Sequence, residues 1–162
     1  DQLQASIPPL SPPVVTPAPS VVACRDLTDA QRATPQQACQ TSTGAIYTRV
    51  TVRGLGQAWR GPDANGVIFS DFMGNFPYAQ IQAECAWYHA FAATADDYIS
   101  GEHSNFREVL PGMSGPDGTR YFWTRSQVEQ DPQDVYVLHP RGALRPTRID
   151  SANYSLRCVI RP

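Results

Sequence analysis

The sequence predicts an α+β domain with mixed or antiparallel sheets, one main helix, long loops and two disulfides. Three observations support this prediction. Several segments have the period-2 alternation or apolar content of strands, one segment has the apolar spacing of a helix, and four cysteines are widely spaced. The chain has 162 residues, enough to bury a core. We expect a globular domain over residues 24–162, preceded by a Pro-rich segment over residues 1–23.

The N-terminal segment is dominated by proline, with six of the 15 prolines in residues 1–20. Proline lacks a backbone N–H, so this segment is expected to be extended or polyproline II. We interpret it as a spacer that holds the globular part away from a cell surface or fibre shaft, with a disordered tail as the alternative. The start at Asp1 suggests a chain whose export signal has been removed.

Strands are predicted where apolar residues alternate or form short runs between turn signals. The expected strands are Ala45–Arg53, Val67–Ser70, Thr119–Arg125, Asp134–His139 and Asn153–Arg161. In the last strand, Cys158 falls on the buried face, whereas Arg157 and Arg161 fall on the outer face. In the strand around Phe122, we expect one face in the core. For the other face we favour a buried Trp123, with a face that lines a ligand-binding surface as the alternative. Gln130–Gln133 and Pro140–Asp150 are expected to be irregular connections.

Helical signals fall in three places. Residues 24–40 are expected to form short turns capped by Asp26 or Thr28. The main helix is predicted over residues 77–90, because four apolar residues recur at helical spacing and place Cys85 on the buried face. These four residues are Tyr78, Ile81, Cys85 and Tyr88. Thr94 and Asp97 form a capping box for a brief helix ending at Gly101, and Ser104 is expected to cap another short turn.

The four cysteines, Cys24, Cys39, Cys85 and Cys158, contain no C-x-x-C pair of the kind used for zinc or redox chemistry. An even number of widely spaced cysteines favours disulfides and therefore an exported, secreted protein. Four cysteines permit three pairings. We favour Cys24–Cys39, which closes a short loop, and Cys85–Cys158, which closes a long one.

Charge and motifs narrow the function classes. The formal net charge is −2 and every basic residue is arginine, without the dense basic field of a nucleic-acid binder. No apolar run reaches the ~20 residues that a membrane helix needs, so we expect no membrane insertion. The G-x-S-x-G, H-E-x-x-H and P-loop motifs are absent. We expect no enzyme, no cofactor and no metal.

Two polar segments contain residue types that occur in metal sites or catalytic sites. The turn around Asp63 and Asn65 has calcium-binding residue types but lacks the downstream ligands of an EF-hand. The cluster of Asp96, Asp97 and Glu102–His103 is dense enough for acid–base chemistry. A capped helix followed by a solvated loop explains the cluster more simply.

The order of elements in residues 64–162 resembles C-type-lectin-like domains of bacterial surface proteins, which occur at the tips of adhesins, in collagen-like adhesins and in minor pilins. The most specific parts are Phe122-Trp-Thr124 and Leu156-Arg-Cys-Val159. The resemblance implies a disulfide from the first helix to the last strand, in agreement with Cys85–Cys158. Phe91-Ala-Ala-Thr94 replaces the family's Arg-Leu-Pro-Thr stretch. The Glu-Pro-Asn and Trp-Asn-Asp motifs of calcium-dependent sugar binding are absent, so that activity is not carried over.

The resemblance implies a non-enzymatic adhesin domain at a bacterial cell surface or fibre tip, which binds a glycan or another surface macromolecule. We expect binding through the loops around Tyr98–Arg120 and Gln130–Gln133, where irregular backbone leaves side chains free. The candidate ligand contacts are Tyr98, His103, Asn105, Arg120 and Arg125. Homotrimer or fibre assembly would add avidity. The alternative function is a structural pilin-like or fibre-capping subunit without a ligand of its own.

Overall fold

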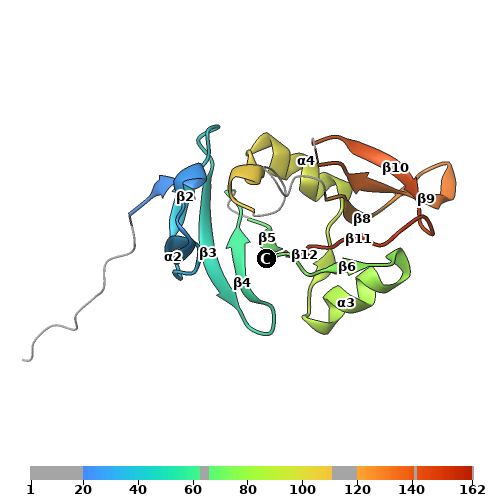
Figure 1. Cartoon of the computed structure of the whole chain (residues 1–162), viewed down its shortest axis with the longest axis horizontal. Helices are drawn as coiled ribbons and strands as arrows, with labels where there is room; N and C mark the ends of the chain where they lie inside the picture. The colour runs from blue at the N-terminus through green and yellow to red at the C-terminus, as the bar shows by residue number, and fades with distance from the viewer. Residues whose placement is uncertain (1–19, 63–65, 111–119, 141, 162) are drawn as a thin grey trace, which may run out of the picture.

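The computed structural model of the chain describes residues 20–62, 66–110, 120–140 and 142–161 (Figure 1). Two sheets and a few short helices make up this part, which confirms the α+β class and the dominance of strands. In Figure 1 the N-terminal strands lie on the left and the C-terminal strands on the right. Helix α4 lies above the region between them and α3 below it.

The first sheet contains seven strands among the described residues, in the order β1-β2-β3-β4-β5-β12-β7. They are β1 (Val22–Ala23), β2 (Ala38–Gln40), β3 (Ile46–Val52), β4 (Gly56–Arg60), β5 (Ile68–Ser70), β7 (Phe91–Ala92) and β12 (Cys158–Ile160). The β1–β2 pair is parallel and the other pairs are antiparallel. The C-terminal strand β12 lies between β5 and β7, so the end of the chain is inside the sheet.

The second sheet has five strands within the described ranges, in the order β10-β9-β8-β11-β6. They are β6 (Asn75–Phe76), β8 (Phe122–Val128), β9 (Asp131–Leu138), β10 (Leu144–Arg148) and β11 (Tyr154–Ser155). Strand β11 is parallel to β8 and antiparallel to β6. It therefore joins the early strand β6 to the late hairpin β8–β9.

The helices are short. They are η1 (Cys24–Asp26), α2 (Asp29–Arg32), η2 (Tyr78–Gln80), α3 (Ile81–Trp87), α4 (Ala95–His103) and η3 (Phe106–Glu108). The predicted main helix is present as η2 followed by α3, and Cys85 is buried as expected. The helix ends earlier than predicted because His89 adopts a left-handed conformation, φ 58°. No described helix is long and apolar enough to cross a membrane.

Two predicted helix caps are confirmed. Thr28 caps α2, with Gln31 completing the capping box. Thr94 and Asp97 form the predicted box at the start of α4. However, α4 does not end at Gly101, because Gly101 lies inside it where Phe106 packs closely against the helix.

Both favoured disulfides, Cys24–Cys39 and Cys85–Cys158, are present. The first bridge ties η1 to β2 and the second ties α3 to β12. All four cysteines are completely buried. The Cys85–Cys158 bridge joins residues 73 apart in the sequence, so the chain between α3 and β12 forms one disulfide-closed loop.

The predicted last strand, Asn153–Arg161, is divided between the two sheets. β11 belongs to the second sheet and β12 to the first, and Leu156 and Arg157 join them. The chain is covered on both sides here, and Ser155 through Val159 are all buried. The prediction that Arg157 lies on an outer face is therefore wrong.

The strand around Phe122 is also covered on both faces. Phe122 packs in one hydrophobic cluster with Trp59, Phe69 and Tyr98, whereas Trp123 packs in a second cluster with Cys85 and Leu156. The favoured interpretation, that Trp123 is buried, is therefore confirmed.

Several strands were not predicted. β4 follows the Gly54–Gly56 turn, β10 lies within the expected loop Pro140–Asp150, and β9 already begins at Asp131. Strand β1 begins at Val22, so the first sheet includes two residues of the predicted spacer. Residues 1–19, the calcium-type residues Asp63 and Asn65, and the loop over residues 111–119 lie outside the described ranges.

Candidate functional site: a pocket between α4 and the first sheet

A pocket of about 410 Å³ lies between one side of α4 and the residues around the start of β3, the end of β4 and β5. We call it the α4 pocket. Its lining residues come from both sides and from the end of the chain: Tyr47, Gly61, Pro62, Val67, Phe69, Asp96, Asp97, Ser100, Gly101, Ser104 and Arg161. This lining combines charged, hydroxyl and aromatic side chains.

The capping box of α4 fixes one charged wall of the α4 pocket. The Thr94 backbone N–H donates to Asp97 Oδ2 at 2.8 Å, and the Asp97 N–H donates to Thr94 Oγ1 at 3.1 Å. The side chain of Asp97 is almost fully buried. A carboxylate in the first helical turn is also favoured by the positive end of the helix dipole. Its position is thus determined before any ligand binds.

Asp97 in turn orients Arg161. Nη2 of Arg161 donates to both carboxylate oxygens of Asp97, at 2.7 and 2.8 Å. The Nε and Nη1 groups of Arg161 make no hydrogen bond with a described residue, and the side chain is 43% exposed. A guanidinium has a rigid arrangement of donors, so holding one nitrogen also orients the other two. Arg161 therefore presents donor groups at the pocket.

The base of the α4 pocket is apolar and well packed. Phe69 is buried and its ring lies 5.6 Å from that of Phe106. Tyr47 is also buried, and its hydroxyl lies 2.5 Å from Ser104 Oγ. Asp96 and Ser100 are exposed and also line the pocket, where they add an acceptor and a hydroxyl group. A polar ligand with one apolar face would complement this arrangement.

Among the predicted ligand contacts, Tyr98 and His103 lie on α4 and line a separate hollow of about 210 Å³, with Leu138 and Leu144 opposite. The side chain of Tyr98 is completely buried, so it is not available at the surface. His103 is exposed. Asn105 follows α4 in a left-handed conformation, and its Nδ2 donates to Ser42 Oγ.

The two predicted arginines lie over exposed aromatic rings. The guanidinium of Arg120 is 4.1 Å from the ring centre of Phe72, and that of Arg125 is 5.6 Å from the ring centre of Phe91. None of the five predicted residues lines the α4 pocket. The sequence prediction therefore did not identify this site.

The acidic cluster weighed for enzyme chemistry is divided among structural roles. Asp97 caps α4 and pairs with Arg161, while Glu102 Oε1 accepts from Arg107 Nε at 2.6 Å. Within the described ranges, no group of three His, Cys, Asp or Glu side chains has the arrangement of a metal site.

The sequence reasoning missed Arg161 and Tyr47. Asp97 was recognised as a cap, but its partner is 64 residues away and has no local signal. Tyr47 was placed correctly on a strand, without any indication that α4 would lie opposite it. Compared with known proteins, the chain matches no family model, no curated protein and no solved structure.

Proposed function

We propose that this domain is a non-enzymatic adhesin module that binds a glycan or another surface ligand in the α4 pocket. The observation that carries the proposal is the Asp97–Arg161 pair, which leaves two oriented donor nitrogens beside an apolar base. The proposal includes a C-type-lectin-like architecture and display at a bacterial surface or fibre tip. These parts are supported by the sequence resemblance and by the bridge between α3 and β12.

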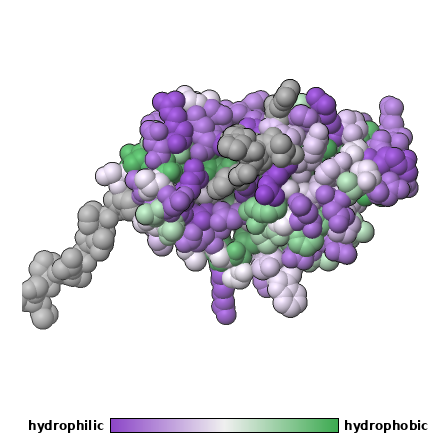
Figure 2. All heavy atoms as spheres, in the orientation of Figure 1, coloured by the Kyte–Doolittle hydropathy of each residue, from purple (hydrophilic) through white to green (hydrophobic). Residues whose placement is uncertain are grey.

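A hydroxylated ligand suits the groups available. Sugar hydroxyls both donate and accept hydrogen bonds, and the pocket offers Arg161 as a donor, Asp96 as an acceptor and Ser100 as either. The apolar face of a sugar ring would lie toward the base formed by Phe69. On the face shown in Figure 2, hydrophilic residues cover most of the surface, and hydrophobic residues form small separate areas. A small ligand in a pocket fits such a surface better than a broad apolar partner.

The test is a glycan array probed with the wild type, Arg161→Gln, Ser100→Trp and the control Arg53→Gln. Arg53 is exposed at the β3–β4 turn and does not line the pocket. We expect a defined glycan class to bind the wild type and the control. Binding by Arg161→Gln should be weaker by about tenfold, since a charge-assisted hydrogen bond is lost. Ser100→Trp should block the pocket.

Absence of binding across a diverse array would argue against the glycan proposal. Self-association of the chain, measured by size exclusion and lost on removal of residues 1–19, would then favour the structural-subunit alternative. That truncation point keeps β1 in the first sheet.

A further inference from the structure

Strand β1 ends the first sheet, and its outer edge has no partner among the described strands. β1 pairs in parallel with β2 on one side only, with Val22 opposite Cys39 and Ala23 opposite Gln40. In Figure 1 it is the blue strand beside β2 at the left end of the molecule. An edge strand presents unpaired N–H and C=O groups, which can pair with another extended strand.

This edge is held at both of its ends. At the first, the buried side chain of Gln37 donates from Nε2 to Ser20 O at 2.8 Å. At the second, Cys24 directly after β1 is bridged to Cys39 of β2. The backbone from Ser20 to Cys24 is therefore fixed against the sheet before any partner arrives.

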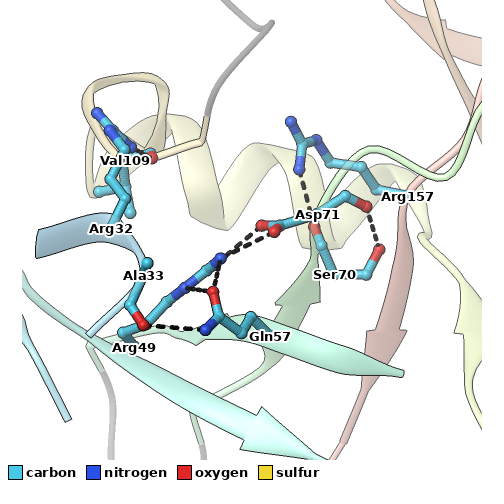
Figure 3. A network of polar contacts seen from close by, with 8 residues as sticks. All are labelled: Arg32, Ala33, Arg49, Gln57, Ser70, Asp71, Val109 and Arg157. Carbon is cyan, nitrogen blue, oxygen red and sulfur yellow. Dashed lines mark hydrogen bonds and ion pairs between the residues drawn. The ribbon is translucent and has the colours of Figure 1, made fainter. Parts of the chain in front are cut away.

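The segment that leads to Gln37 is itself fixed by polar contacts (Figure 3). Arg32 Nη1 donates to Val109 O, and Ala33 O accepts from Gln57 Nε2 at 3.0 Å. These contacts join the segment after α2 to η3 and to β4. An edge that is fixed in advance loses little conformational entropy when a second strand pairs with it.

The other end strands of the two sheets are protected. β10 contains Pro146, which lacks an N–H, and the exposed Arg145. β6 is followed directly by Pro77. β7 leads to Ala93, whose carbonyl accepts from the Arg125 N–H of β8 at 2.9 Å. Within the described ranges, β1 is thus the one end strand without a proline, a charge or a covering segment.

The side chains at this edge suit strand pairing. Ser20-Val-Val-Ala23 contains no charge and no proline, and β-branched valines favour strands. Val21 is 55% exposed. A hollow of about 250 Å³ beside the edge can take a side chain from an incoming strand. It is lined by Val21, Val22, Ala23, Arg25, Gln40, Thr41, Ser42 and Glu108.

We propose that the edge Ser20–Ala23 is a self-association surface, at which two copies of this chain pair β1 with β1 in antiparallel orientation. Two identical antiparallel strands are related by a two-fold axis, so the same edge serves both copies and the assembly closes as a dimer. The hollow carries one charge of each sign, Arg25 and Glu108, so two copies of this surface do not meet with like net charge.

The pairing is short, so the dimer is weak in free solution and is favoured where copies are held close together. The edge and its hollow share no residue with the α4 pocket. The proposal therefore does not rest on the proposed function.

The test is sedimentation equilibrium of the full chain at increasing concentration, with Val21→Lys, Val21→Glu and the control Ile46→Lys. Ile46 is an exposed apolar residue of β3, two strands from the edge, and does not line the hollow. We expect a reversible monomer–dimer equilibrium in the wild type and the control. Each Val21 variant alone should dimerise at least about tenfold more weakly, because like charges are then brought close across the two-fold axis.

An equimolar mixture of Val21→Lys and Val21→Glu should associate more strongly than either variant alone, because opposite charges then meet. This rescue also shows that both variants are folded. Removal of residues 1–19 keeps β1 and should leave the dimer intact.

A wild type that stays monomeric would overturn the proposal and leave the edge to a strand of another protein. Unchanged dimerisation in both Val21 variants would overturn it, as would a mixture no stronger than its components. Loss of the dimer in Ile46→Lys with retention in Val21→Lys would also overturn it, because the contact would then lie on the face of the sheet. Loss on removal of residues 1–19 would overturn it by assigning the contact to that segment.

Discussion

Arg157 donates from Nη1 to the backbone oxygen of Ser70, 87 residues earlier, at 2.8 Å, and both residues are buried. The neighbouring N–H of Cys158 donates to Ser70 Oγ, also at 2.8 Å. The guanidinium of Arg157 also lies 5.3 Å from the ring centre of Phe122. A charged side chain thus joins the two sheets where the terminal segment passes from one to the other.

Replacement of Arg157 should therefore destabilise the fold. Arg157→Ala removes a large buried side chain and leaves Ser70 O without this donor, so we expect a loss of about 3–5 kcal/mol in unfolding free energy. Urea denaturation measures the loss. Arg145→Ala, at an exposed position, is the control and should change stability by less than about 0.5 kcal/mol. Equal stabilities of the two variants would show that Arg157 does not join the sheets.

Two buried tyrosines should respond in opposite ways to loss of the hydroxyl. The Tyr98 hydroxyl is buried and has no hydrogen-bond partner among the described residues, whereas that of Tyr47 is bonded to Ser104. We expect Tyr98→Phe to be neutral or stabilising and Tyr47→Phe to lose about 1 kcal/mol. Thermal and urea unfolding of both variants measure the difference. A larger loss in Tyr98→Phe would contradict the assignment of an unbonded hydroxyl.

Tyr98 should also make the unfolding free energy of the protein sensitive to alkaline pH. Burial raises the pKa of Tyr98 above its usual value of 10, so above pH 10 the unfolded chain releases this proton while the folded chain keeps it. The contribution of Tyr98 to the unfolding free energy is fully present below pH 10. Above pH 10 the unfolding free energy falls by up to about 1.4 kcal/mol per pH unit because of this group. Tyr98→Phe should remove that component in unfolding measurements between pH 9 and about 11.

Arg157 opposes this trend, because its pKa is lowered to about 10 in the folded chain, so the unfolded chain is the stronger proton binder from about pH 10 up to the higher ordinary pKa of arginine. The comparison is therefore between Tyr98→Phe and wild type, since both retain Arg157. Identical pH slopes in the two proteins would mean that Tyr98 titrates normally.

Gly101→Ala should destabilise the protein although alanine favours helices by about 1 kcal/mol relative to glycine. An added Cβ would lie 2.5 Å from Cδ2 of the buried Phe106 ring. We expect a net loss of about 1–3 kcal/mol from overpacking, measured by urea unfolding. Ser100→Ala on the exposed side of α4 is the matched control. A stabilised Gly101→Ala variant would show that Phe106 can move away.

The two disulfides should contribute unequally. Cys85–Cys158 closes a loop of 73 residues and Cys24–Cys39 one of 15. In the loop-entropy description, paired alanine substitutions should cost about 4.5 kcal/mol for the long bridge and about 3 kcal/mol for the short one. Calorimetric unfolding of the two double variants measures the costs, and a non-reducing peptide map checks the pairing. A greater cost for the short bridge would contradict this description.

Local patterns in the sequence were sufficient for several elements. Alternation predicted β3, the apolar repeat predicted the helix with Cys85 on its buried face, and Thr94 with Asp97 predicted the start of α4. Each of these signals lies within one element and depends on nearest neighbours along the chain. The cysteine count and spacing likewise indicated two disulfides, and the favoured pairing is confirmed.

Other elements had no local signal. Strand β10 lies in a proline-containing segment that pairs with β9, and the terminal strand divides between two sheets. Alternation reports one-sided burial, so it could not reveal that Arg157 lies in a segment covered on both sides. Tyr98 was expected to be a surface contact because two of its three aromatic neighbours, Phe69 and Phe122, are distant in sequence.

The sequence by itself therefore determined the fold class and the caps, because these depend on residue type and short spacing. For the cysteines it indicated two disulfides and left three pairings possible. Only the tertiary structure decided the α4 pocket, which depends on Arg161 meeting Asp97 across 64 residues. Likewise, Ser70, Asp71 and Phe72 contact arginines from three distant parts of the chain. These contacts form when the disulfide-closed loop between Cys85 and Cys158 folds back on the first sheet. The local periodicity of the sequence carries no information about that folding.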